Sequence, residues 1–265
     1  MERRKEYPKG EEGFFEIIKP GDGTKYLGFG ILKLKKGQSW ELDSGGREYV
    51  FLILKGYSKV GNLEIGPRKD VFSSKASAVY VPKWESVRIE AIYDSEIAIV
   101  SAPAREKYEM KLVKPEEVRV RVVGQGNWRR HVHDVVYENV DANMLLVGET
   151  FNPPGNWSSY PPHRHDVDDI PYESDMEEVY HYRIKPKHGF GVQLIYTDDK
   201  SVDELIKIEN GLTVIIDRGY HPVVAAPGYT IYYLWALAGE KRILIPRDDP
   251  KHAWIKDVEA ILRDW

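Results

Sequence analysis

The amino-acid sequence predicts an all-β protein built from two tandem repeats of one sandwich or barrel. Its apolar segments are short, rich in β-branched and aromatic residues, and separated by Gly, Pro or Asp-Asp clusters, which is typical of strands joined by turns. Helical periodicity is scarce along the 265 residues. Two sequence patterns also recur, each in both halves of the chain, which indicates a duplication.

Nine segments carry the strand pattern. They are residues 26–34, 49–60, 78–82, 87–91, 96–101, 144–151, 189–197, 212–216 and 230–237. Two segments read as helical. The tail from Trp254 to Trp265 is the clearest helix candidate, and Ser201 to Ile208 begins like a capped single turn, because Ser201 is a good N-cap and Glu204 follows three residues later.

The two halves resemble diverged copies of each other. Residues 79–87 have the shape of residues 214–222, and residues 48–54 resemble residues 178–184, at separations of 135 and 130 residues. The stretch between the copies, residues 104–120, is charged and interrupted by Pro115, as a linker or crossover would be. We therefore predict two domains, residues 1–118 and residues 119–265.

Composition excludes several classes of function. The chain has no cysteine, so disulfides, thiolate nucleophiles and Cys-zinc sites are absent. The formal net charge of -4, with mixed charges, predicts no nucleic-acid partner. The longest apolar run, Tyr229 to Gly239, is shorter than the ~20 residues that span a bilayer. The start, MERRKEYPKG, lacks the apolar region of a secretory signal, so we expect a cytoplasmic protein without membrane contact. Nucleotide-binding glycine motifs and the GxSxG elbow are also absent.

All eight histidines lie between His131 and His252, which places any imidazole chemistry in the C-terminal half. In an extended segment His163 and His165 point to the same side. Together with Glu178 and His221 they would form a site with three nitrogen ligands and one oxygen ligand, which suits Zn, Mn, Fe or Ni. A second pair, His131 and His133, has no neighbours that complete a ligand set, and we interpret it as polar residues at a strand edge.

Several motifs in the C-terminal half resemble the 5-deoxy-glucuronate isomerase family of myo-inositol catabolism. The most specific is GNWSSYPPHRHD, from Gly155 to Asp166. The others are EEVY at 177–180, GFGVQ at 189–193, YTDD at 196–199, GYHP at 219–222, PGY at 227–229 and YYL at 232–234. The resemblance is dense over residues 124–255 and weaker in the N-terminal half. It extends to the 4-deoxy-threo-hexosulose-uronate ketol-isomerases of pectin breakdown.

The resemblance implies the fold and the metal ligands. It implies an all-β bicupin: two tandem double-stranded β-helix (jelly-roll-like) barrels with a short C-terminal helix, and one divalent metal in the second barrel alone. Zinc is the expected ion, with manganese or iron as alternatives. Matched motif by motif, the ligands are His163, His165, Glu178 and His221, although Glu177 stays open as the carboxylate. Twelve residues separate His165 from Glu178, so this acidic insertion is expected to loop out between two strands.

The implied activity is conversion of 5-deoxy-D-glucuronate, a small sugar acid, to 2-deoxy-5-keto-D-gluconate. A proton must leave C2 and arrive at C1, with a metal ion as Lewis acid and a general base to move the proton. Glu149 is the candidate for direct catalysis. Tyr232 and Tyr233 alternate along a strand, so only one can face the barrel interior.

The substrate carboxylate calls for a guanidinium or an ammonium group. Its candidate partners are Arg129, Arg130, Arg183, Arg218 and Arg242, with Arg242 preferred. Arg183 lies five residues after Glu178, hence on the opposite face of a regular strand. Tyr160, in the GNWSSYPPHRHD motif, is a further substrate-binding candidate.

Three alternatives stay open at this point: the related uronate ketol-isomerase of pectin breakdown, an iron-dependent dioxygenase, and a non-catalytic sugar-binding bicupin. Strand edges of such barrels commonly pair between subunits, so a homo-oligomer is compatible with the sequence, without a predicted stoichiometry.

Overall fold

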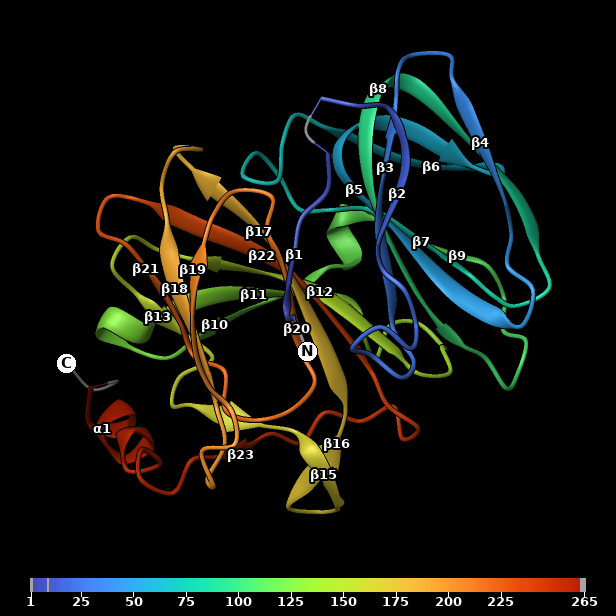
Figure 1. The fold of residues 1–265 in the computed structure, drawn as a ribbon. Coiled ribbons are helices and arrows are strands. Elements are labelled where there is room, and N and C mark those ends of the chain that lie inside the picture. Colours follow the sequence, from blue (N-terminus) through green and yellow to red (C-terminus); the bar gives the residue numbers. More distant parts are fainter. Residues whose placement is uncertain (1, 9, 263–265) are drawn as a thin grey trace.

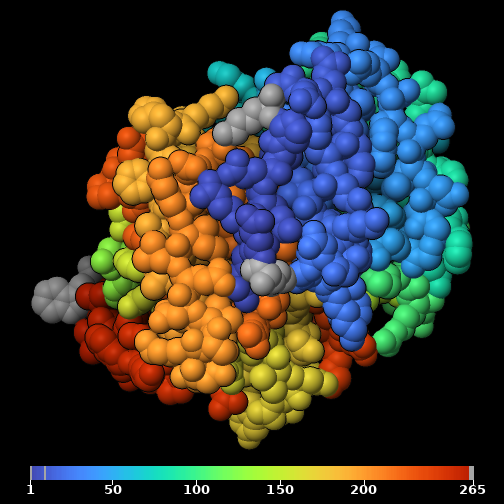
Figure 2. Space-filling view, viewed as in Figure 1, coloured from blue at the N-terminus to red at the C-terminus, as the bar shows by residue number. Residues whose placement is uncertain are grey.

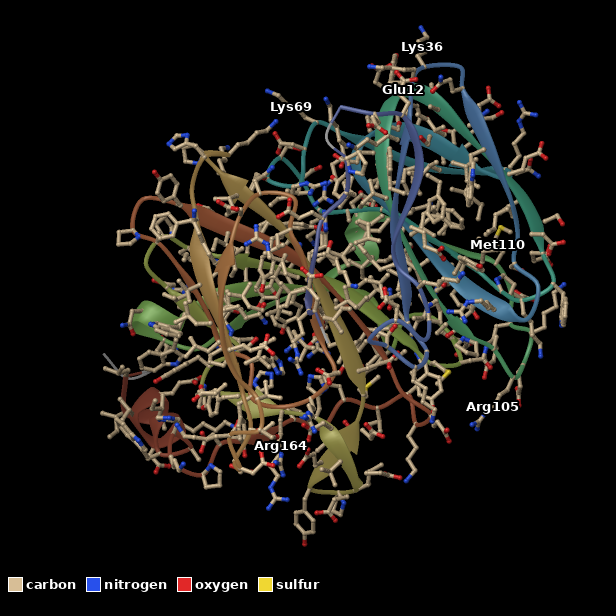
Figure 3. The ribbon with its side chains drawn as sticks, in the orientation of Figure 1. Glu12, Lys36, Lys69, Arg105, Met110 and Arg164 are labelled. Atoms are coloured by element: carbon tan, nitrogen blue, oxygen red, sulfur yellow. The ribbon has the colours of Figure 1, made fainter. Side chains whose placement is uncertain are left out.

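The computed structural model describes residues 2–8 and 10–262 and shows two β-lobes side by side (Figure 1). One lobe carries most of the N-terminal half, coloured blue to teal, and the other carries the C-terminal half, coloured green to red. Charged residues such as Lys36, Lys69 and Arg105 lie at the rim of the molecule and point away from it (Figure 3). None of the helices in these residues is long and apolar enough to cross a membrane.

The N-terminal lobe is one eight-stranded sheet. Its strands are β2 (Gly13–Ile18), β3 (Gly28–Leu34), β4 (Ser39–Asp43), β5 (Arg47–Val60), β6 (Leu63–Arg68), β7 (Ala78–Val81), β8 (Ser86–Pro103) and β9 (Lys111–Val113). The order is β2-β3-β8-β5-β7-β9, with β4 paired to β8 and β6 paired to β5. The segments predicted at 87–91 and 96–101 form one strand, because β8 continues past Tyr93 with shifts of register against β5.

The C-terminal lobe is built on a seven-stranded sheet. Its order is β1 (Arg4–Lys5), β20 (Thr213–Ile216), β17 (Glu177–Lys185), β22 (Thr230–Ala238), β12 (Leu145–Asn152), β11 (Arg130–Val136) and β10 (Arg119–Val123). A four-stranded sheet contains β13 (Trp157–Ser158), β21 (Val223–Ala225), β18 (Gly191–Tyr196) and β19 (Asp203–Ile208).

Short elements complete this lobe. Two strand pairs are β14 (His163–Arg164) with β23 (Arg247–Asp248), and β15 (Asp166–Asp169) with β16 (Glu173–Asp175). Two 3₁₀ turns, Pro115–Glu117 and Gly126–Trp128, flank β10. The pair β15–β16 is the acidic insertion, which projects from the lobe as a hairpin (Figure 1).

The first strand crosses between the lobes. Arg4 and Lys5 pair with Val214 and Thr213 of β20, at the edge of the C-terminal sheet. In the space-filling view this N-terminal segment lies over the seam between the lobes (Figure 2). All other strands up to β9 belong to the N-terminal sheet, and those from β10 onward belong to the C-terminal lobe. We retain residues 1–118 and 119–265 as the proposed division into domains.

The tail helix forms as expected, whereas the predicted helical turn does not. Helix α1 spans Ile255–Leu262, and residues 263–265 of the prediction lie outside the described residues. Residues 201–208 contain strand β19 instead, because Leu205, Ile206 and their neighbours pair with β18 and alternate between solvent and interior. The alternation along β19 has the two-residue period of a strand.

Both faces of the central strands of the seven-stranded sheet, β12, β17, β20 and β22, are buried. One face packs against the N-terminal lobe through alternate residues such as Val147, Val179 and Tyr232. The residues between them, such as Leu146, Tyr180 and Tyr233, point into the C-terminal lobe. A strand that is buried on both sides has its two sets of side chains in two different cores. This alternation determines which polar side chains reach the site described next.

Candidate metal centre

The two histidines of the HRH sequence lie on β14 and immediately after it. Backbone pairing of His163 with Asp248 and of Arg164 with Arg247 keeps this segment extended. Because side chains alternate along an extended segment, His163 and His165 point the same way. His165 is buried, and His163 is half-buried.

Glu178 and His221 approach the histidine pair from two other segments. Glu178 is the second residue of β17, which is paired on both sides, with β20 and β22. His221 follows a turn at Gly219, whose backbone φ of +89° is a conformation that favours glycine. The Gly219 N–H donates to an oxygen of Asp166 (2.6 Å), which ties this turn to the strand that follows the histidine pair.

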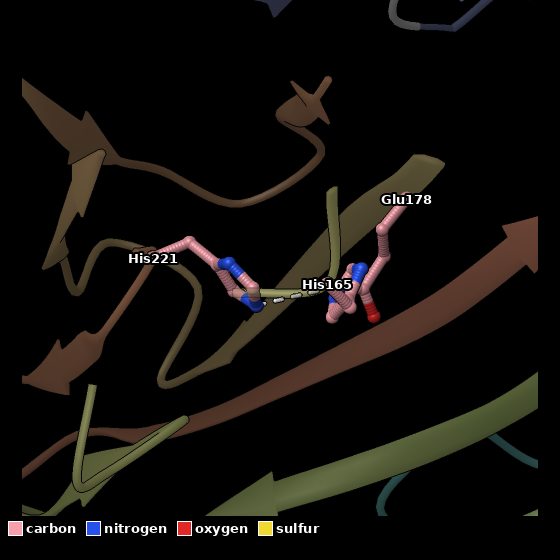
Figure 4. A group of neighbouring side chains, drawn as sticks. All are labelled: His165, Glu178 and His221. Atoms are coloured by element: carbon pink, nitrogen blue, oxygen red, sulfur yellow. Dashed lines mark hydrogen bonds and ion pairs between the residues drawn. The ribbon is translucent and has the colours of Figure 1, made fainter. Parts of the chain in front are cut away.

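His165, Glu178 and His221 form a compact group that could hold a metal ion (Figure 4). The Nε2 atoms of His165 and His221 lie 3.2 Å and 3.4 Å from Oε2 of Glu178. One ligand atom from each residue lies within 4.8 Å of the other two. The His163 ring is next to this group, with its centroid 5.0 Å from the His221 ring and 6.3 Å from the His165 ring.

The hydrogen bonds of the two imidazoles fit a bound cation. Nδ1 of His165 donates to the Met176 carbonyl (2.7 Å), and Nδ1 of His221 donates to the Gly219 carbonyl (3.0 Å). In a neutral imidazole this leaves the lone pair on Nε2, so both lone pairs face the Glu178 carboxylate. Nε2 of His221 is buried without a hydrogen-bond partner among the described residues. Backbone carbonyls commonly orient metal-binding histidines in this way.

Electrostatics keep two histidines in the neutral form that binds metals. Burial, reinforced by the neighbouring imidazoles, lowers the pKa of His163 well below its usual range. Burial also lowers the pKa of His221 to about 4, against the opposing attraction of Glu178. For His165, burial works in the same direction, but the hydrogen bond to Glu178 and its charge raise the pKa overall. Metal binding needs deprotonated ligands, so the lowered pKa values favour it.

Glu177, the alternative carboxylate, points to the opposite face of β17. Its oxygens accept the backbone N–H groups of Lys25 (2.6 Å), Tyr26 (2.7 Å) and Leu27, all in the N-terminal half. Of the two adjacent glutamates, Glu178 is therefore the one that faces the histidines.

A cavity of about 270 Å³ opens beside this group and is lined by both His163 and Glu178. Tyr160, Tyr180 and Tyr233 contribute to its walls. The hydroxyl groups of the last two are held by serines: Tyr180 lies 3.0 Å from Ser159 Oγ, and Tyr233 contacts Ser158 Oγ. The two serines precede Tyr160 in the GNWSSYPPHRHD motif, so the motif supplies cavity wall as well as imidazoles.

Four residues expected at the site lie elsewhere. Glu149 is fully buried and forms an ion pair with Arg68 of the N-terminal lobe (2.7 Å), and the Tyr232 hydroxyl donates to the same carboxylate (2.8 Å). Both belong to the face of the seven-stranded sheet that meets the N-terminal lobe, whereas Thr150 and Tyr233 face the cavity. The strand alternation that separates Tyr232 from Tyr233 separates Glu149 from Thr150.

Arg242, the preferred arginine, and Arg183 also lie outside the cavity. Arg183 lies in a separate cavity of about 800 Å³ between the lobes, where it pairs with Glu96 (2.6 Å) and the Tyr7 hydroxyl (3.1 Å). Arg242 donates to the carbonyls of Leu145 and Tyr137. Their hydrogen-bonding groups are thus used in holding the structure together, and two other arginines, Arg121 and Arg130, line the cavity.

The second histidine pair takes no part in the metal group. His131 and His133 lie on β11, which is paired on both sides and is therefore not an edge strand. His133 packs on Phe151, with ring centroids 4.7 Å apart. Tyr180 had no predicted role, although the sequence contained it in the EEVY motif. Its position two residues after Glu178 was the available signal, because residues two apart on a strand share a face.

Curated relatives match almost the whole chain. A 5-deoxy-glucuronate isomerase of Geobacillus kaustophilus is 42% identical over 254 residues, covering 93% of this chain and 92% of the relative. The 5-deoxy-glucuronate isomerase of Bacillus subtilis strain 168 is 36% identical over 247 residues and covers 91% of each chain.

Solved structures agree with the architecture. An IolB-like protein of Salmonella typhimurium LT2 superposes with a TM-score of 0.91 at 34% identity, covering 97% of this chain and all of that one. An oxalate decarboxylase of Lactobacillus farciminis has a TM-score of 0.66 at 11% identity, covering 95% and 89% of the two chains, and so shares the fold alone. The predicted all-β bicupin is confirmed. The family model described as the KduI/IolB family matches residues 2–255. This match, together with the relatives above, shows that the chain belongs to the KduI/IolB family.

Proposed function

We propose that this protein is a metal-dependent aldose–ketose isomerase that converts 5-deoxy-D-glucuronate to 2-deoxy-5-keto-D-gluconate. The names of the curated relatives support the reaction, at 36–42% identity over nearly the full chain. The observation that carries the proposal is the cluster of His165, Glu178 and His221 beside a cavity lined by His163 and Glu178. Such a cavity gives a small sugar acid access to a metal centre.

The proposed ligands are His163, His165, Glu178 and His221, and the proposed ion is zinc. A set of three imidazoles and one carboxylate suits zinc, and also manganese or iron. The isomerisation reduces C1 and oxidises C2 within one molecule, so the metal need not change its oxidation state, which is compatible with zinc. When bound, the divalent cation would act as a Lewis acid toward the sugar oxygens at C1 and C2 and ease removal of the proton from C2.

The cavity tyrosines would act as hydrogen-bond donors to the sugar. Burial raises the pKa of Tyr180 well above its usual value and also raises the pKa of Tyr233. Both hydroxyl groups therefore keep their protons at neutral pH. Ser158 and Ser159 fix the direction in which these hydroxyls point, so each can orient a sugar oxygen in the cavity. Tyr160, on the same wall, is a third candidate for contact with the substrate.

The proposal is tested by assaying the purified protein on 5-deoxy-D-glucuronate, with metal content measured in parallel. Treatment with a chelator is expected to abolish turnover, and addition of zinc or manganese to restore it. The substrate of the pectin-pathway isomerase, offered separately, tests the alternative specificity. Absence of isomerisation by protein that carries a full complement of metal would disprove the proposal.

Two histidine variants test the ligand assignment. His165→Ala and His221→Ala are expected to lose both metal and activity while the fold is retained. His188→Ala is the matched control, because it removes an exposed imidazole outside the cavity and should leave the metal content unchanged. Full metal content in both ligand variants would show that the ion binds elsewhere.

A further inference from the structure

Arg130 is buried in the wall of the cavity with half of its hydrogen-bonding fork unused. It is 8% exposed and begins strand β11. Its Nη1 donates to the carbonyls of Trp128 (3.2 Å) and Tyr160 (3.0 Å). Nε and Nη2 have no hydrogen-bond acceptor among the described residues, and Arg130 lines the cavity. One edge of the guanidinium is thus held by the protein, and the other edge is available to a ligand.

The charge of Arg130 also lacks a direct partner. No carboxylate oxygen of residues 2–8 or 10–262 lies within 4.0 Å of its guanidinium nitrogens. The two other cations of this cavity differ: Arg121 is paired with Asp134 through two hydrogen bonds (2.8 Å and 2.7 Å), and Lys256 is paired with Asp248. Glu259, in the same cavity wall, acts on Arg130 through its charge, which opposes the lowering of the pKa of Arg130 by burial.

A buried cation without a counter-ion is costly unless an anion binds beside it. Burial lowers the pKa of Arg130, but a guanidinium stays charged at neutral pH. The free Nε and Nη2 atoms lie on one edge of the planar group, which matches the two oxygens of a carboxylate. Arg130 therefore has the geometry and the unmet charge of a carboxylate site.

We propose that Arg130 binds the carboxylate of the sugar-acid substrate, as a substrate-binding residue that makes the site selective for uronates; this rests on the proposed function. An extended six-carbon sugar spans about 6 Å, at about 1.2 Å per bond of an extended chain. Arg130 lines the same cavity as His163 and Glu178, and besides burial its charge helps to lower the pKa of His163, so the arginine lies near the metal group. The cavity volume of about 270 Å³ suits a single small sugar.

The experiment compares two substrates, 5-deoxy-D-glucuronate and its neutral amide, in the metal-loaded wild type and in Arg130→Gln. We expect kcat/KM for the acid to fall about 100-fold in the variant, because a charged hydrogen-bonded pair is lost. For the amide we expect kcat/KM to change by less than about threefold, because the neutral amide forms no charged pair with Arg130. Arg129→Gln is the matched control, since it removes the charge of the preceding residue, which is exposed to solvent.

A structural role for Arg130 gives a different result. If Arg130 only holds the carbonyls of Trp128 and Tyr160, the variant loses acid and amide turnover equally, and this result overturns the proposal. An unchanged acid-to-amide ratio at full activity overturns it as well. If Arg130→Gln does not fold, Arg130→Lys keeps the charge without the fork, and it must still lower the preference for the acid. The proposal also requires that the wild-type protein prefers the acid to the amide. Equal binding of the acid and the amide by the wild type would by itself exclude the proposal.

Calorimetric titration with 5-deoxy-D-glucuronate separates this inference from the proposed reaction. If the wild type binds the acid in an Arg130-dependent manner without turning it over, the proposed reaction fails and the carboxylate site stands. If turnover occurs but binding and specificity ignore Arg130, the reaction stands and the carboxylate site is disproved.

Discussion

Two adjacent glutamates have separate tasks because neighbouring residues of a strand point in opposite directions. Glu178 faces His165 and His221, and Glu177 accepts three backbone N–H groups of the N-terminal half. One residue thus belongs to the metal group, whereas the other joins the lobes.

Substitution of Glu178 should affect metal binding, and substitution of Glu177 should affect stability. Glu178→Gln should weaken metal affinity about 10-fold or more, since a charged ligand is replaced by a neutral one. Glu177→Gln should leave the metal content unchanged and lower the free energy of unfolding by about 1–3 kcal/mol, because its charged hydrogen bonds are weakened. Metal analysis and urea unfolding of both variants measure the two effects. A metal loss in Glu177→Gln alone would reverse the assignment.

At the scale of elements, the turn before His221 depends on one glycine. Gly219 has a φ of +89°, and a Cβ there would lie 2.6 Å from the Tyr196 carbonyl oxygen. The same carbonyl accepts the Tyr220 N–H (2.8 Å), so the turn is pressed against β18. The position of His221 follows from this close approach.

Gly219→Ala should therefore reduce both stability and metal affinity. Gly228→Ala is the matched control, because Gly228 has a φ of +86° but open space around its Cβ position. The control should lose about 1–2 kcal/mol from backbone strain alone. Gly219→Ala should lose more and should also bind less metal, because the turn must shift. Equal effects in unfolding and metal titration would contradict this view of the turn.

At the scale of the whole molecule, a buried ion pair connects the two lobes. Arg68 of β6 and Glu149 of β12 are almost inaccessible to solvent, and Arg68 also donates to the carbonyls of Ile53, Val71 and Ser74. Tyr232 donates to Glu149 as well. Both charges are buried next to the apolar core at the junction, so either charge alone would lose its main partner.

Arg68→Met should lower the free energy of unfolding by about 3–5 kcal/mol, because Glu149 becomes an unpaired buried charge. The double variant Arg68→Met/Glu149→Leu should recover most of this loss. Arg88→Met removes an arginine from an exposed pair with Glu41 and should change stability by less than about 1 kcal/mol. Denaturant titration of the three proteins gives the comparison. No recovery in the double variant would mean that the pair acts by more than charge compensation.

Acid should destabilise the metal-free molecule through its buried histidines. Burial lowers the pKa of His221 to about 4, and it lowers the pKa values of His163 and His181 well below the usual range. Between about pH 6.5 and 4 the unfolded chain binds more protons than the folded one, so stability is full above this window and falls with pH. His221 alone corresponds to about 3 kcal/mol over that range.

Urea unfolding of the metal-free protein from pH 7 to pH 4 measures how the free energy of unfolding falls with pH. His165 acts in the opposite sense, because its raised pKa contributes stability at low pH that is lost as pH rises through the folded value. The variant His221→Asn should show a shallower fall between pH 6.5 and 4 than the wild type. Identical slopes would mean that His221 does not titrate in this way.

The sequence by itself determined the strands and the shared direction of the histidine pair, because each depends on neighbours along the chain, whereas the bicupin was implied by the resemblance to a known family. Strand periodicity and turn residues are local, and the spacing of His163 and His165 fixes their shared side. Local pattern failed where pairing decided the outcome. The sequence of residues 201–208 predicted a capped turn, but these residues contain a strand that pairs with β18. The polar residues around Tyr93 predicted a break between two strands, but pairing with β5 keeps β8 continuous there.

Only the tertiary structure decided which face of each strand meets the cavity. Alternation separates Glu177 from Glu178, and Glu149 from Thr150, but the central strands of the seven-stranded sheet are buried on both sides. Their two sets of side chains are equally apolar, so hydrophobicity could not tell the face toward the metal from the face toward the N-terminal lobe. The partner of each buried charge comes from a distant segment, as Arg68 does for Glu149. Which arginine faces the cavity therefore follows from the packing of the lobes.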